Sequence, residues 1–452
     1  MSLDFNIALS GLRAGEKMLS VAQNNIANAT NTSYARQRVE VSASEIPQNS
    51  SGVGAQMGTG TVVEGITRIR DELLIQQSRT EEGYVGYYGA ASDALSNIET
   101  IFNETGENSV SDLLNNFFNA FEEAGKFPEK SSYRLSAAYS GKMLSEKIRG
   151  ISAEIDEVKG QTDTNLTTNV TKINQLLNQI ANIHKKMETV TSQDPNALLD
   201  QRDKLLDELS QYVDVQVINK ANPMNMEIKV GNATLLSGKT VYDIDEMYVT
   251  EKDQWVLAAS DVEFTPKSGS LAGILDARNN YIPKYEDGLN TLVGSLIEKV
   301  NQEHSSGYGL DGTTGMRFFL GSDIRTIELN PELEINPEKI ALSSENGTTG
   351  NSDISKNISA LAKSEFVDGK EPGRYYQEYT VRLASDLNEI KNNEKIHSDV
   401  QSGMESQRQA VQGVNTDDEL ADLMIFQKYY QSNAKTLNIV NDLMDKLLNI
   451  IG

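Results

Sequence analysis

The stretch "FNIALSGLRAGEKMLSVAQNNIANA", residues 5–29, repeats its large apolar side chains every seven positions. A small residue follows each of them by three positions. The large residues are Phe5, Leu12, Leu19 and Ile26, and the small ones are Ala8, Gly15, Ala22 and Ala29. A seven-residue repeat of this kind predicts a helix that packs lengthwise against another helix, with the small residues allowing a close approach.

The C-terminal end carries a matching repeat. Its apolar residues also fall seven apart, with a second set at the complementary position: Leu423, Tyr430, Leu437, Met444 and Ile451, accompanied by Phe426, Val440 and Leu447. We therefore expect residues 1–40 and 412–452 to form one terminal domain, in which the N- and C-terminal helices pair as a coiled coil.

Helical spacing continues over most of the chain between these ends. The segment from Leu144 to Val190 alone would approach about 70 Å if it were unbroken. Residues 41–211 and 271–411 are therefore predicted to form a helical rod with short β elements, among them a strand region from Phe318 to Leu342.

The apolar period changes to two near Val213, where "VDVQVI" begins an alternating pattern. Similar short runs follow, separated by Gly, Asn, Pro and Asp, so residues 212–270 are predicted to be an inserted outer β domain. The predicted fold class is mainly α with an inserted β domain, an α+β multidomain protein built as an elongated helical rod.

Composition excludes several classes of function. The net charge of -24 opposes binding to phosphate backbones, so we expect no nucleic-acid partner. No run approaches the roughly 20 apolar residues of a membrane span, which predicts no membrane insertion. The start of the chain has no basic segment before its apolar part and does not resemble a cleaved signal peptide, so export would need another route.

No pattern indicates catalysis, a cofactor or a metal. His184, His304 and His397 are far apart and lie in no metal-binding spacing, so solvated or capping histidines are expected. "LLSGKT", residues 235–240, lacks the earlier glycine of a phosphate loop and is interpreted as a turn. "GVGAQMGTG", residues 52–60, is interpreted as a loop or hairpin. We predict that the chain is not an enzyme.

Four stretches of the sequence carry a resemblance to known proteins. "NNIANATNTSYARQ", residues 24–37, is similar to the N-terminal signature that rod, hook and hook-associated proteins share. Two internal stretches, "LLDQRDKLLDELS" (198–210) and "GSLAGILDARNNYI" (269–282), narrow the resemblance to the FlgK family of flagellar hook-associated proteins. The ending from Gly413 to Ile450 is also similar to the ending of that family. The family usually has glycine where this chain has Ser33, and Asn31 can supply the positive φ that a glycine would allow.

The resemblance implies a structural subunit exported unfolded by the flagellar type III system, needed for filament assembly and located outside the cell at the hook–filament junction. The implied partners are other copies of the chain in a ring, the hook protein and hook-associated protein 3. An export chaperone is implied for the C-terminal helix, with the type III export apparatus.

Asn24, Asn28 and Asn31 recur at helical spacing and form a polar stripe. Spacing alone favours asparagines that simply end a helix, whereas the resemblance implies that the stripe faces a neighbouring subunit. The predicted subunit interface comprises Phe5, Leu12, Leu19, Asn24, Asn25, Ile26, Asn28, Asn31, Tyr34, Arg36, Leu423, Phe426, Tyr430, Leu437, Val440, Met444, Leu447 and Ile451.

Two alternatives stay open at this point. One is another flagellar axial protein, a hook or distal rod protein. Such a protein would lack the "LLDQRDKLLDEL" type of helix and carry more β structure. The other is a secreted adhesin or hydrolase with coiled-coil ends, whose activity would reside in residues 212–270.

Overall fold

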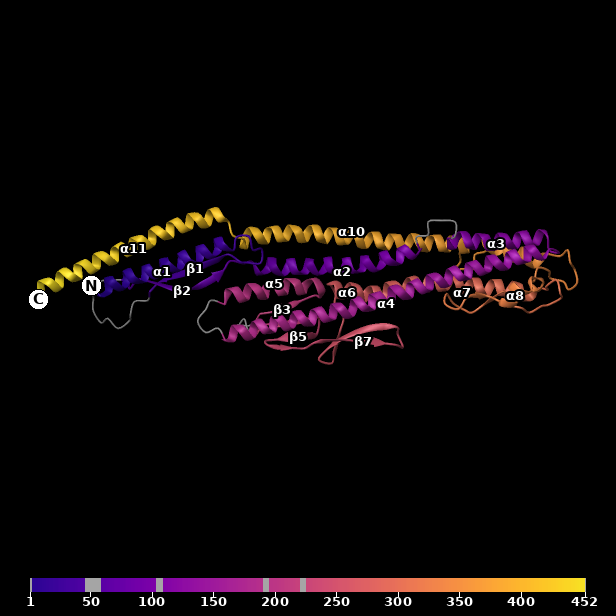
Figure 1. Cartoon of the computed structure of the whole chain (residues 1–452), viewed down its shortest axis with the longest axis horizontal. Helices are drawn as coiled ribbons and strands as arrows, with labels where there is room; N and C mark the ends of the chain where they lie inside the picture. Colours follow the sequence, from indigo (N-terminus) through magenta and orange to yellow (C-terminus); the bar gives the residue numbers. More distant parts are fainter. Residues whose placement is uncertain (1, 45–57, 103–108, 190–194, 220–224, 452) are drawn as a thin grey trace.

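The longest element is helix α4, Ser131–Thr189, which runs unbroken for 59 residues and is therefore about 88 Å long. In the computed structural model it lies lengthwise in an elongated molecule, and helices α1 and α11 together form one end (Figure 1). The structure describes residues 2–44, 58–102, 109–189, 195–219 and 225–451. The predicted class, an elongated and mainly helical molecule with an inserted β region, is confirmed.

Helices account for most of the described chain. They are α1 (Ser2–Ala27), α2 (Glu72–Phe102), α3 (Val110–Lys126), α4, α5 (Asn196–Tyr212), α6 (Ser270–Asp276), α7 (Ile282–Ser306), α8 (Pro331–Ile335), α9 (Asp353–Ala360), α10 (Pro372–Gln412) and α11 (Thr416–Ile451). A π-helix, Ala277–Tyr281, joins α6 to α7, and 3-10 turns occupy Pro337–Lys339 and Leu361–Lys363.

The inserted region contains two antiparallel sheets. One has the order β3 (Gln216–Ile218), β4 (Glu227–Val230), β5 (Ala233–Ser237), β6 (Thr240–Val241), and the other β7 (Ile244–Val249), β8 (Gln254–Ala259), β9 (Val262–Phe264). The "LLSGKT" stretch is a turn, as predicted, because Gly238 with a φ of 60° joins β5 to β6.

Two other β regions differ from the expectation. Strands β1 (Gln37–Ala43) and β2 (Thr61–Arg68) pair antiparallel directly after α1, although no strand was predicted there. The two strands flank the "GVGAQMGTG" stretch, which was interpreted as a loop or hairpin and of which residues 52–57 lie outside the described residues. The expected strand region from Phe318 to Leu342 holds only β10 (Phe319–Leu320) and β11 (Glu328–Leu329), because prolines begin helical turns at Pro331 and Pro337.

Helix α4 contributes to two separate apolar cores. Near its N-terminus, Leu144, Ile148 and Ile151 pack with Phe117, Phe121 and other side chains of α3, α7 and α9, and we call this the distal core. Towards its C-terminus, Leu166, Ile173 and Leu177 pack with side chains of α5, α6 and the two inserted sheets. The inserted strands therefore share their core with the rod instead of folding over one of their own.

The histidines are neither solvated nor capping, which corrects the expectation. The His304 side chain is buried in the distal core, where its Nδ1 lies 2.7 Å from the Met316 carbonyl oxygen and its Nε2 accepts a hydrogen bond from the Ala341 N–H. His184 is buried beside the Gly238 carbonyl. His397 is half-buried, stacks on Tyr88 and pairs with Glu81. The spacing of the three histidines in the sequence did not indicate these surroundings.

Burial, with a smaller contribution from Arg134, lowers the pKa of His304 to about 4 against the opposing hydrogen bond to the Met316 carbonyl. An unfolded histidine has a pKa near 6.5, so the unfolded state gains a proton first as the pH falls. The distal core is therefore expected to lose up to ~3 kcal/mol of stability between about pH 6.5 and pH 4. Urea unfolding of wild type and His304→Gln across this range measures it. The advantage of the wild type at pH 7 should shrink as the pH falls, and a pH-independent difference would contradict the assignment.

Candidate assembly interface at the chain ends

Helices α1 and α11 lie side by side along one end of the molecule (Figure 1). We refer to these two helices as the terminal pair. The predicted pairing of the N- and C-terminal helices is therefore confirmed. Helix α10 meets the terminal pair at Gln412, whose carbonyl accepts a hydrogen bond from the Arg36 N–H at 2.8 Å.

Small residues make the closest contact within the terminal pair. A Cβ added at Gly11 would lie 2.5 Å from Asn433 Oδ1, and one added at Gly15 would lie 3.1 Å from a ring carbon of Tyr429. The buried positions of α1 include Ala8, Gly11, Ala14, Gly15, Val21 and Ala22. Three of the predicted small positions, Ala8, Gly15 and Ala22, are thus inside, whereas Ala29 lies beyond the end of α1 and is half-buried. The predicted large residues Phe5, Leu12, Leu19 and Ile26 are likewise only half-buried.

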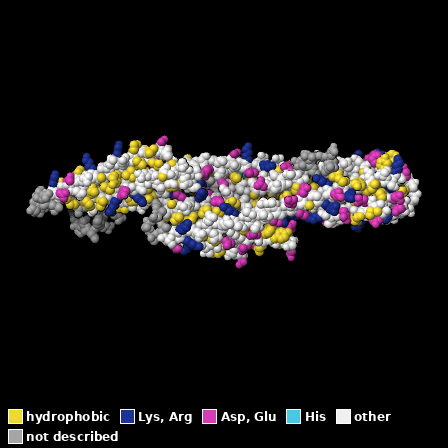
Figure 2. All heavy atoms as spheres, in the orientation of Figure 1, with side chains coloured by type: hydrophobic (Ala, Val, Ile, Leu, Met, Phe, Trp, Pro, Cys, Tyr) yellow, Lys and Arg dark blue, Asp and Glu magenta, His cyan; other side chains and the backbone are white. Residues whose placement is uncertain are grey.

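Helix α11 also leaves much of its apolar surface uncovered. Among the predicted residues Val440 is buried, while Leu423, Phe426, Tyr430, Leu437 and Met444 are half-buried. The side chains of Leu447 and Ile451 lie outside the described residues. Hydrophobic side chains gather on this end of the molecule (Figure 2), so the terminal pair retains apolar surface that its own two helices do not cover.

Asn25 organises the turn between α1 and β1. Its side chain is only 1% exposed; Oδ1 accepts hydrogen bonds from the Tyr34 hydroxyl at 2.7 Å and the Gln37 N–H at 3.0 Å. Its Nδ2 donates to the Gln37 carbonyl and to Glu419 Oε2, both at 3.0 Å. Arg36 pairs with the other oxygen of Glu419 at 2.6 Å. One buried amide therefore ties α1, β1 and α11 together.

The predicted interface residues accordingly divide into two groups. Asn25 and Tyr34 are buried within their own chain, and Arg36 pairs with α11, so the side chains expected to meet a neighbour make intramolecular bonds instead. Asn24 and Asn31 are exposed and Asn28 is half-buried. The expected positive φ at Asn31 is not observed, because its Oδ1 accepts a hydrogen bond from the Ser33 N–H and shapes the turn.

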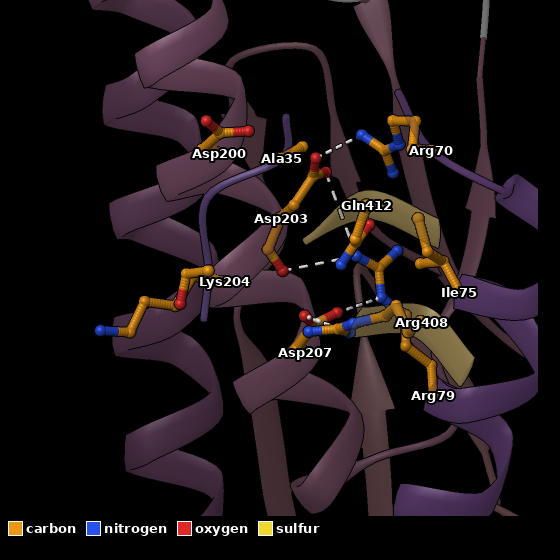
Figure 3. Close-up of a pocket in the computed structure, with 11 residues that line it drawn as sticks. Ala35, Arg70, Ile75, Arg79, Asp200, Asp203, Lys204, Asp207, Arg408 and Gln412 are labelled. Carbon is orange, nitrogen blue, oxygen red and sulfur yellow. Dashed lines mark hydrogen bonds and ion pairs between the residues drawn. The ribbon is translucent and has the colours of Figure 1, made fainter. Parts of the chain in front are cut away.

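A cluster of arginines and aspartates lies where the terminal pair meets the rod, and we call it the charged joint. Asp203 of α5 accepts from Arg68 at 2.7 Å and also pairs with Arg70. Asp207, one turn further along α5, pairs with Arg79 of α2 at 2.7 Å and with Arg408 of α10 at 2.9 Å. Figure 3 shows Asp200, Asp203 and Asp207 on one face of α5, with Asp203 and Asp207 directed towards arginines from other elements. Asp200 pairs with Arg68 at 2.8 Å.

Burial and charge act in opposite directions on these carboxylates. Burial disfavours the charged form of Asp203, but Arg70, Arg68 and Arg202 outweigh it and lower its pKa. At Asp200 burial dominates and raises the pKa despite the hydrogen bond from Arg68. The charged joint therefore keeps Asp203 ionised as the common partner of several arginines.

The sequence analysis missed Gln37, Glu419 and the charged joint. The spacing of Asp200, Asp203 and Asp207 within "LLDQRDKLLDELS" places them on one helix face and was the available signal. Their arginine partners come from distant segments, which no local pattern reveals. Within the described ranges, no three His, Asp or Glu side chains are grouped as metal ligands would be.

Two family models match different parts of the chain. Residues 405–450 match the model described as "Flagellar basal body rod FlgEFG protein C-terminal", an ending that several axial proteins share. Residues 95–319 match the model described as "Flagellar hook-associated protein FlgK helical domain", which covers α4, the inserted sheets and α7.

The chain belongs to the FlgK family. It is 27% identical to flagellar hook-associated protein 1 of Bacillus subtilis (strain 168), over 98% of this chain and 97% of the relative. It is 24% identical to flagellar hook-associated protein 1 of Salmonella typhimurium (strain LT2), over the full length of both. The solved flagellar hook junction protein FlgK from Burkholderia pseudomallei has a TM-score of 0.50 at 19% identity, over 54% of this chain and 46% of that one, and supports the fold.

Replacing Asn25 by Ala is expected to loosen this FlgK-family terminal unit. The change leaves Glu419 and the Gln37 N–H in the buried site without one partner, at a cost of about 1–3 kcal/mol. Hydrogen exchange of β1 and the first turn of α11 should then accelerate roughly ten- to hundredfold, since about 1.4 kcal/mol corresponds to a factor of ten. Asn28→Ala is the matched control, because the hydrogen bonds that the structure describes for the Asn28 side chain run to Asn24 and not to β1 or α11. Equal exchange in both variants would contradict this role for Asn25.

Proposed function

We propose that this chain is a structural, non-enzymatic subunit that joins the hook of a bacterial flagellum to its filament and is needed for filament assembly. The match of residues 95–319 to the FlgK helical domain carries the proposal, because the rod-type ending alone would equally suit a hook or distal rod protein. Several copies form a ring through the terminal pair, whose uncovered apolar surface is suited to a neighbouring subunit.

The ring has two different neighbours along the flagellar axis. We infer that the hook protein lies on one side and hook-associated protein 3 on the other. The subunit reaches this extracellular position through the type III export apparatus, with an export chaperone bound to its C-terminal helix beforehand. The small buried side chains of α1 favour this route, because a helix pair that buries so little apolar surface is readily separated. No described helix combines the length and the apolarity that a membrane span requires.

The proposed interface is the predicted set of terminal residues without Asn25, Tyr34 and Arg36, whose side chains bond within their own chain. Asn24, Asn28 and Asn31 form its polar part at the end of α1. The half-buried apolar residues of α1 and α11 form the remainder. The proposed domain division also remains: the terminal domain 1–40 with 412–452, the rod 41–211 with 271–411, and the insertion 212–270.

A deletion strain tests the function. Loss of the gene should leave hooks without filaments and unpolymerised flagellin in the medium, as seen by electron microscopy and immunoblotting. Complementation with Leu437→Asp should fail to restore filaments, because a charge would enter the half-buried side of α11. Asn441→Asp adds the same charge at an exposed position of α11 and should restore them. Normal filaments on the deletion strain would refute the junction role.

A further inference from the structure

The face of α11 that points away from α1 begins with a group of exposed apolar side chains. Three of its side chains near the start of the helix are more than a third exposed: Leu420 at 50%, Met424 at 60% and Ile425 at 59%. At 3.6 residues per turn, Leu420 and Met424 lie a third to a half of a turn round the helix from Phe426, which faces inwards. An apolar stripe of this kind on a soluble chain indicates a docking surface.

A groove lies on the other side of the terminal pair, at the same level of α11. It has a volume of about 400 Å³ and opens between α1, β1 and α11. Its lining mixes apolar side chains, among them Val21, Val39 and Phe426, with the charged side chains of Arg36, Arg38, Glu419 and Asp422. Val41 is 42% exposed at its edge, so the groove can receive side chains of the size of methionine or isoleucine.

The two acidic side chains that line the groove, Glu419 and Asp422, already pair with Arg36, at 2.6 and 3.6 Å. Asp417 and Asp418 begin α11 beside Leu420, are exposed and form no ion pair with the described residues. Arg38, at the groove, is likewise exposed and without an ion pair to any residue that the structure describes. Bringing a second terminal pair against the groove would place the two aspartates of one copy near the arginine of the next.

We infer that the exposed stripe of α11, at Leu420, Met424 and Ile425, docks into the α1–β1–α11 groove of the next copy of this chain. Because stripe and groove face different directions, the contact is head-to-tail and can continue from copy to copy until the ring closes. In a closed ring all copies lie at the same height along the ring axis. The part of α11 that enters the neighbouring groove is therefore the part at the height of Phe426, which lines that groove. This inference rests on the proposed ring and specifies which surfaces join its members.

The chain has no cysteine, which allows the contact to be tested by disulfide trapping. Chains carrying Val41→Cys and chains carrying Met424→Cys are co-expressed, hooks with their junctions are isolated, and disulfide-linked dimers are separated without reductant. A disulfide forms only when the two Cβ atoms approach to about 4 Å. We expect a dimer in the mixed sample that is absent when either variant is expressed alone.

The matched control is a mixture of Val41→Cys and Ile439→Cys chains. Ile439 lies on the same exposed face, at 51% exposure, but several turns further along α11, so no mixed dimer should form. Filaments that grow on junctions containing both variants, with no 41–424 dimer or with an equally abundant 41–439 dimer, would overturn the inference and leave the proposed function intact. Absence of the wild-type chain from the junction in immunogold images would overturn the proposed function, and the inference with it.

Discussion

The structure depends on the continuous apolar stripe of α4. One helix of 59 residues supplies side chains to both large cores, so the distal core and the inserted sheets have a fixed position relative to each other. A break in α4 would separate these cores, whereas an unbroken helix transmits their relative orientation along about 88 Å. The rod is therefore stiffened by the same burial that folds it. Removal of the inserted strands would uncover Leu166, Ile173 and Leu177, so the insertion is part of the rod's stability.

The terminal pair follows a different principle. Its buried positions on α1 are mostly alanine and glycine, which bring the helices close together but remove little apolar area from water. The hydrogen bonds of Asn25 and the ion pairs of the charged joint supply directional polar contacts at the base of the terminal pair instead. These contacts fix where the helices leave the rod. The remaining apolar surface of α11 is not covered by the described part of the chain.

Some of this organisation could be predicted from the sequence and some could not. The seven-residue repeats around Leu12 and Leu437 identified the partner helices, and the change of period near Val213 identified the inserted sheets, because both are local patterns with a single physical cause. The small residues of the α1 repeat proved more buried than the large ones, because burial depends on how closely the axes of α1 and α11 approach each other. Asn25 was selected as an interface residue, yet its partners Gln37 and Glu419 can be known only from the fold. The arginines around Asp203 are likewise joined to it only by tertiary structure.

The central claim is that a stiff, well-buried rod carries a terminal pair whose stability comes from assembly. Hydrogen exchange measured on the verified monomer and on isolated junctions tests it most directly. In the monomer, amides of α1 and α11 should exchange at least about a hundredfold faster than those of α4 between Leu144 and Leu177, and they should become protected in the junction. Equal, strong protection of α1, α11 and α4 in the monomer would contradict the account.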